Sequence, residues 1–346
     1  MRDPARAGAP LMRVLDRIDA FQQRHRSVGL PLAVVYKYFD DQGNLLTALI
    51  TYYGFLSLFP LLLLMVTILG FLLQGDPGLQ QRVVDSALSQ FPIIGDQIAG
   101  NITGLRGSGV AVAVGVVVSL YGGLGAAQAA QTALNKVWGV PRGSRPNPLM
   151  ARLRSLLMLV IVGGGILLTT VLSALTTAAE TYGGGVGTAG RIGAAALAVI
   201  VNIGLFMLAF RLLTVRAVTI KQIRGGAIAA AVIWQALQSA ATFYLGHVLR
   251  TANSSYGTFA LVLGLFAWIY LGALTLVLCA EVNAVRAERL WPRNLRTVFV
   301  DDVELTAADQ RAYRSYATTE RHKSSEHIEV TFDHPPSSPG PPDPAS

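Results

Sequence analysis

Residues 251–286 read TANSSYGTFALVLGLFAWIYLGALTLVLCAEVNAVR. The first 30 of these residues carry no formal charge, and the run ends at Glu281. A bilayer core about 30 Å thick is crossed by roughly 20 apolar residues in a helix. The stretch is therefore long enough to span a membrane and too long for a core helix of an ordinary soluble domain. It predicts a membrane protein.

The composition of the whole chain agrees with this prediction. The 346 residues are 52% hydrophobic and only 14% charged, whereas soluble domains average about 25% charged residues. The mean hydropathy of +0.47 excludes a wholly disordered chain. The single cysteine, Cys279, excludes an internal disulfide and any multi-cysteine zinc or iron–sulfur site. Most of the chain is expected to lie in lipid.

Five further stretches also lack Asp, Glu, Lys and Arg, so the chain contains six in all. They are Leu45–Leu73, Gly107–Asn135, Ser155–Ala179, Ile192–Phe210, Gly225–Leu249 and Thr251–Ala280. We therefore predict an all-α, polytopic membrane protein with six transmembrane helices. Its expected parts are an amphipathic arm over residues 1–44, the six-helix domain over 45–285 and a polar tail over 286–346.

The basic residues predict the orientation of these six spans. Counted from the N-terminus, the segments outside the spans hold 7, 2, 5, 1, 4, 1 and 8 lysines and arginines. The alternation places 24 basic residues on one side and 4 on the other, and cytoplasmic loops are the basic ones. Both termini are therefore expected in the cytoplasm. The net charge of +8 is explained by basic flanks beside the anionic inner leaflet and requires no nucleic acid.

The two ends of the chain have different expected roles. Apolar residues from Leu11 to Ile18 recur at helical spacing among charges, which predicts an amphipathic helix on the inner leaflet. The next stretch, Leu30–Phe39, is expected at the interface, with Lys37 in the headgroup zone. At the other end, Pro335–Ser346 contains six prolines in twelve residues and is expected to be disordered.

Polar residues inside the spans are the candidates for function, because each costs free energy in hydrocarbon unless it faces a partner or water. With the predicted orientation they lie between the midplane and the cytoplasmic end. The candidate lining of a polar cavity is Tyr52, Gln128, Asn202, Gln238 and Glu281. The alternative for the amides is hydrogen bonding between helices.

Glu281 also has two interpretations. It is an interfacial carboxylate paired with Arg286 or Arg289 at the end of its helix, or an inner-mouth carboxylate that binds a cation, a proton or a polar headgroup.

Motifs for catalysis, cofactors and metals are weak. Residues 185–190 read GVGTAG, but a dinucleotide-binding fingerprint needs a preceding strand, and here a predicted membrane helix precedes it. The histidines of the tail match no zinc spacing. We assign no catalytic residue, no cofactor and no metal site.

Three groups of motifs occur in order along the chain. They are TYYGFLSLFPLL at residues 51–62, YGGL at 121–124 with ALNKVWG at 133–139, and SYGT at 255–258 with WIYL at 268–271 and AEVNA at 280–284. Together they resemble the YihY/BrkB family of bacterial inner-membrane proteins, once described as ribonuclease BN. The resemblance covers roughly Leu30–Arg289 and implies six helices in the inner membrane with both ends inside. It singles out Tyr52, Pro60, Asn135, Tyr256 and Glu281.

The resemblance does not assign an activity to the protein. The residue types present nevertheless limit which activities are expected. A phosphodiesterase needs metals held by clustered His and Asp or an acid–base pair facing water, and five scattered histidines supply neither. We do not expect an enzyme. The leading expectation is a permease-like or lipid-handling protein with a polar cavity open to the cytoplasm, for an unknown solute or lipid. The alternative is a structural or scaffolding protein of the envelope, with no cavity and with polar groups paired between helices.

Overall fold

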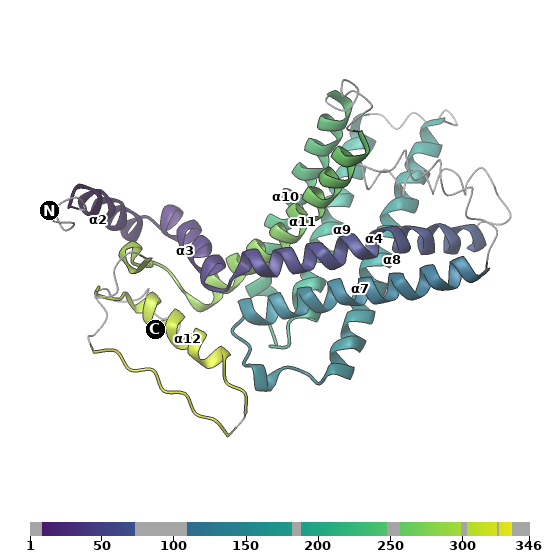
Figure 1. Ribbon diagram of the computed structural model, residues 1–346. Helices are drawn as coiled ribbons and strands as arrows, with labels where there is room; N and C mark the ends of the chain where they lie inside the picture. The colour runs from purple at the N-terminus through teal and green to yellow at the C-terminus, as the bar shows by residue number, and fades with distance from the viewer. Residues whose placement is uncertain are drawn as a thin grey trace.

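The computed structural model describes residues 9–72, 109–181, 188–247, 257–298, 303–323 and 325–333. Over these ranges every regular element is a helix, nine of them α-helices (Figure 1). The α-helices are α2 (Ala9–Arg24), α3 (Arg26–Asp40), α4 (Gly43–Leu72), α7 (Gly109–Val137), α8 (Pro148–Thr181), α9 (Thr188–Leu213), α10 (Ile220–His247), α11 (Gly257–Glu288) and α12 (Ala307–Thr319). Two 3-10 helices, η2 (Arg142–Ser144) and η5 (Leu295–Val298), complete the set. The predicted all-helical class is confirmed.

Long helices occur at the six charge-free stretches. Among the described residues, three windows within these helices are long and apolar enough to cross a membrane, namely Pro148–Gly165 in α8, Ala196–Leu213 in α9 and Val262–Glu288 in α11. Only 11% of the window in α8 is buried against the rest of the protein. Its exposed residues include Leu149, Leu153 and Val160. A helix that exposes so many large apolar side chains is suited to lipid rather than to water.

The helices pack in pairs through small residues. α4 and α7 lie side by side along their length (Figure 1), and Gly122 of α7 meets the backbone of Ser57 in α4. α10 pairs with α11, where Gly226 faces the carbonyl oxygen of Cys279. A side chain at either glycine would collide with the neighbouring backbone. Close approach at small residues is how helices associate in the absence of a hydrophobic driving force.

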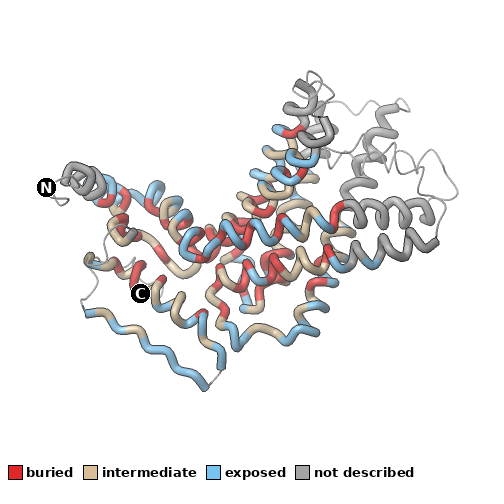
Figure 2. The backbone as a smooth tube through the Cα atoms, in the orientation of Figure 1, coloured by how far each residue is buried: buried red, intermediate tan, exposed pale blue. Residues whose placement is uncertain are grey.

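Several connections and both terminal regions gather at one end of this bundle, which we call the polar end. The α7–α8 connection joins the C-terminal region there, because Arg142 pairs with Glu320 at 2.8 Å. The α9–α10 connection is held by Asn135, whose Oδ1 accepts a hydrogen bond from the backbone N–H of Val215 at 2.8 Å. Buried residues concentrate where this end meets α3, α4, α7 and α11 (Figure 2).

The terminal regions are more structured than the sequence suggests. The segment 286–346, expected as a polar tail, contains α12, which packs its fully buried Ala312 against Ala33 of α3 and Val285 of α11. Thr306 caps α12, and its side chain forms a capping box with Asp309. The expected disorder of Pro335–Ser346 concerns residues outside the described ranges.

Candidate functional site: a buried ionic cluster

Lys37 of α3 points into the protein at the polar end and meets two carboxylates. Its Nζ lies 2.5 Å from Oδ2 of Asp41 and 3.3 Å from Oε2 of Glu281 on α11. Lys37 is only 2% exposed and Glu281 is completely buried. We call Lys37, Asp41 and Glu281 the buried ionic cluster. The expected position of Lys37 in the headgroup zone stays a prediction, but its side chain faces the protein interior, because α3 packs against α11 and buries this face.

The ammonium of Lys37 also completes the end of a neighbouring helix. Val137 is the last residue of α7, and its carbonyl oxygen accepts a hydrogen bond from Lys37 Nζ at 2.9 Å. The last carbonyls of a helix lack partners within it and carry the negative end of the helix dipole. α7 ends here because Gly139 adopts a positive φ of 60°, which glycine allows at little cost.

The carboxylate of Glu281 is the member of the cluster that accepts no hydrogen bond in the described part of the chain. Within the described ranges neither Oε1 nor Oε2 accepts a hydrogen bond, although Lys37 is within ion-pair distance of Oε2. Asp41 takes the short hydrogen bond from Lys37 instead. The cation that faces Glu281 is therefore Lys37 of α3, a residue remote in sequence, where an arginine at the end of its own helix was one expectation.

The charges of the cluster do not balance. With all three groups ionised, one ammonium faces two carboxylates in a region closed to water. Burial by itself lowers the pKa of Lys37, but Glu281 and Asp41 outweigh it and raise that pKa above its ordinary value. The side chain of Lys37 therefore stays protonated and positively charged. The ring of Tyr316 from α12 lies 5.9 Å from Nζ and adds a cation–π contact.

A second buried cation, Arg293, anchors the C-terminal region beside this cluster. Its Nε donates to Oδ1 of Asp309 at 2.5 Å, and its Nη2 lies 3.2 Å from Oδ2 of Asp40. Burial lowers the pKa of Arg293, but the neighbouring Tyr316 and the carboxylates of Asp309 and Asp40 reverse this and raise it. Tyr316 joins the two sites, because its hydroxyl donates to Asp40 at 3.0 Å while its ring faces Lys37.

The other candidate residues are dispersed. Tyr52 is 57% exposed on α4, and its ring packs edge-on against Tyr53. Gln128, Asn202 and Gln238 are half-buried on three different helices. Pro60 lies within α4 at a point where side chains are outside the description, and Tyr256 lies outside the described residues altogether.

Several polar residues in the bundle are paired between elements. Asn135 bonds to Val215, as stated above, and Gln131 of α7 donates to Oγ of Ser155 in α8 at 2.7 Å. The side-chain oxygen of Asn283 accepts from the backbone N–H of Gly226 at 2.7 Å. These bonds tie α7 to α8, α7 to the connection before α10, and α10 to α11.

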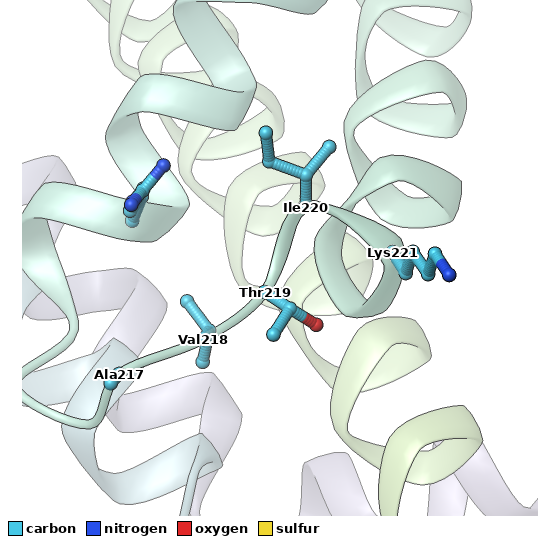
Figure 3. Close-up of a pocket in the computed structure, with 6 residues that line it drawn as sticks. Ala217, Val218, Thr219, Ile220 and Lys221 are labelled. Carbon is cyan, nitrogen blue, oxygen red and sulfur yellow. The ribbon is translucent and has the colours of Figure 1, made fainter.

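An open hollow of about 580 Å³ lies between the end of α9 and the start of α10 (Figure 3). Its lining includes Arg211 and Lys221 beside the apolar Val218 and Ile220. None of the five residues expected to line a cavity belongs to this hollow. Among the described residues, no group of three or more His, Cys, Asp or Glu could hold a metal ion.

Five charged residues of these two sites were missed by the sequence reasoning: Lys37, Asp40, Asp41, Arg293 and Asp309. The spacing of Lys37 and Asp41 by four residues, at the end of a predicted helix, was a signal for a pair. Thr306 followed by Asp309 was a signal for a helix start. The pairs Lys37–Glu281 and Arg293–Asp40, however, join residues far apart along the chain.

The fold and the cluster define a class: an all-helical protein with long, apolar candidate membrane spans and a buried ionic cluster at their polar end. The sequence model of the virulence factor BrkB family matches residues 34–296. The chain belongs to this family, as its motifs suggested. The match includes Lys37, Asp41, Glu281 and Arg293 and ends before α12. No curated protein and no solved structure matches the chain significantly.

Proposed function

We propose that the protein is a permease-like or lipid-handling protein of the bacterial inner membrane, with six spans and both termini in the cytoplasm. The buried ionic cluster is the observation that carries this proposal. Ionisable residues within a membrane span are costly, and those that face the bundle interior commonly mark the paths of ions or substrates. Glu281 is such a residue, since it lies on the candidate span of α11 and is fully buried.

The arrangement of the polar end supports the proposed topology. The N-terminal helices, the α7–α8 and α9–α10 connections and α12 meet there, and these are the segments that the count of basic residues assigns to the cytoplasm. Arg211 and Lys221 beside the open hollow are suited to the anionic headgroups of the inner leaflet. We propose membrane lipids as partners at these basic flanks and no nucleic acid.

Transport in liposomes tests the proposal. The purified protein is reconstituted and assayed with candidate ions, solutes and labelled lipids, and Glu281→Gln is compared with Glu288→Gln. Glu288 is the matched control, because it lies on the same helix two turns further on and pairs with Arg216 at a more exposed position. Movement by the wild type and the control, lost in Glu281→Gln, supports the proposal. No movement by any of the three contradicts it.

A second candidate function is a structural or scaffolding role in the envelope. The hydrogen bonds made by Gln131, Asn135 and Asn283 favour it, since a scaffold needs its buried polar groups paired between helices. It predicts that liposomes containing the protein behave as empty ones do. We do not propose a nuclease, and absence of RNA cleavage by the purified protein is the expected result.

A further inference from the structure

We propose that Asp41 and Glu281 share one exchangeable proton beside Lys37, so that the buried ionic cluster is a proton-binding site. The inference rests on the proposed function and deepens it, because it names the ion to which movement of a solute or lipid would be coupled. It concerns the resting protein as well, since the proton is expected on the cluster whether or not anything is transported.

The charge of the cluster is the first argument. Two carboxylates and one ammonium, all excluded from water, leave one negative charge without compensation. An uncompensated charge in a region of low dielectric is strongly unfavourable and is normally neutralised. One bound proton makes the cluster neutral. A metal cation is a poor substitute, because the ammonium of Lys37 already lies against both carboxylates and repels it.

The hydrogen bonds indicate where the proton resides. Asp41 accepts a hydrogen bond of 2.5 Å from Lys37, which favours its ionised form. Both carboxyl oxygens of Glu281 are buried and accept no hydrogen bond in the described part of the chain. A carboxylate without donors is the poorer anion, so the proton belongs on Glu281. The neighbouring carboxylate of Asp41 interacts with Glu281 and can accept the hydrogen bond that a protonated Glu281 donates.

No other described group supplies the missing positive charge, since Arg293, on the other side of Tyr316, is paired with Asp309 and Asp40. α3 and its end contribute Lys37, Tyr38 and Asp41, and α12 contributes the neutral Tyr316. α7 contributes the carbonyl oxygen of Val137, and the hydroxyl of Thr47 on α4 is hydrogen-bonded to that of Tyr38. On α11 itself Tyr270 faces Tyr38, while Arg286 is exposed beside Gly225 of α10.

Binding of the proton is linked to the contact between α3 and α11. Asp41 follows the last turn of α3, and Glu281 lies on α11, so loss of the proton sets two carboxylates against each other across this contact. The protonated state favours packing of α3 on α11, and the deprotonated state weakens it. In this way a proton gradient would change how tightly α3 packs on α11 at the polar end of the bundle.

Infrared spectroscopy of the full-length protein in lipid nanodiscs tests the site directly. At neutral pH the wild type should show the carbonyl stretch of one protonated carboxylic acid that Glu281→Gln removes and Glu288→Gln retains. Asp41→Asn should also remove it, because a single carboxylate then remains to balance Lys37 and stays ionised. This second variant gives the answer if Glu281→Gln does not fold.

The outcomes separate this inference from the proposed function. A wild type without such a band, or a band unaffected by both Glu281→Gln and Asp41→Asn, overturns the proton site whatever the liposome assays show. A band that disappears in both variants supports it. If that band is present and the liposomes show no movement of any solute or lipid, the proton site stands and the transport proposal fails.

Discussion

Nε of Arg293 donates a hydrogen bond to Oδ1 of Asp309 over 2.5 Å, and both side chains are almost completely buried. Asp309 has a second role, because its Oδ2 accepts hydrogen bonds from the backbone N–H and the hydroxyl of Thr306 at the start of α12. One carboxylate therefore both starts α12 and attaches it to the segment after α11. The orientation of the C-terminal helix depends on this pair.

Removing the guanidinium should release α12. Arg293→Met leaves Asp309 buried and without its cation, which is expected to cost about 3 to 5 kcal/mol. The measurement is the unfolding free energy in detergent, together with proteolysis of the 303–323 segment. Arg142→Met is the control, since it breaks the pair with Glu320 in which both side chains are more than half exposed, and such pairs contribute about 0 to 1 kcal/mol. Equal effects of the two variants would contradict this role of Arg293.

Lys37 should be coupled energetically to Glu281. Lys37→Met removes the only described cation of the buried ionic cluster and the donor to the carbonyl of Val137, so a loss of about 3 to 5 kcal/mol is expected. Glu281→Gln alters the same contact, the 3.3 Å approach of Nζ to Oε2, so the double variant loses that contact only once. The double variant should therefore be more stable than the sum of the single effects predicts. Additive effects in a double-mutant cycle would show that the two groups do not interact.

The contact between α10 and α11 depends on a glycine. Gly226→Ala places a Cβ against the carbonyl oxygen of Cys279 and the side chain of Asn283, so we expect a loss of about 1 to 3 kcal/mol from overpacking. Gly204→Ala in α9 is the control with the opposite sign. A Cβ there has no neighbour within 4 Å, and alanine favours a helix over glycine by about 0.5 to 1 kcal/mol. Thermal unfolding midpoints should move down for the first variant and up for the second.

Alkaline pH should weaken the attachment of α3. Burial raises the pKa of Tyr36 to about 12, while an unfolded tyrosine titrates near 10. Because the folded state holds this proton more tightly, the stabilising contribution is fully present below about pH 10 and decreases as the pH rises toward about 12. Tyr36→Phe also removes the hydrogen bond from the hydroxyl to the carbonyl of Leu295. The wild type should be the more stable at pH 8, and its advantage should shrink above pH 10; a constant difference would contradict the raised pKa.

Labelling in intact cells tests the topology. In a Cys279→Ala background, a cysteine at Ala317 in α12 should be protected from a membrane-impermeant thiol reagent, as should a cysteine at Gly8. A cysteine at Gly184, between the third and fourth predicted spans, should react. Labelling of Ala317 or Gly8 from the periplasm would contradict the cytoplasmic placement of the termini.

The length of the apolar runs was sufficient to predict the helices. A run of 30 residues without charge can satisfy its backbone in lipid only as a helix, so the positions of α4, α7, α8, α9, α10 and α11 could be read from composition alone. The family could be read as well, because its motifs are local and ordered along the chain. Glu281 stood out for the same reason, as the first charge after such a run.

The partner of Glu281 could not be read in this way. Lys37 resembles an interfacial lysine in its own sequence surroundings, and only the packing of α3 on α11 carries it into the interior. Likewise, Arg293 and Asp309 belong to a polar segment that looks unstructured until α12 folds back on α3. Local sequence determines which segments are helical, since hydrogen bonds within a helix are local. The pairs Lys37–Glu281 and Arg293–Asp40 join residues more than 200 positions apart, and tertiary structure alone decides them.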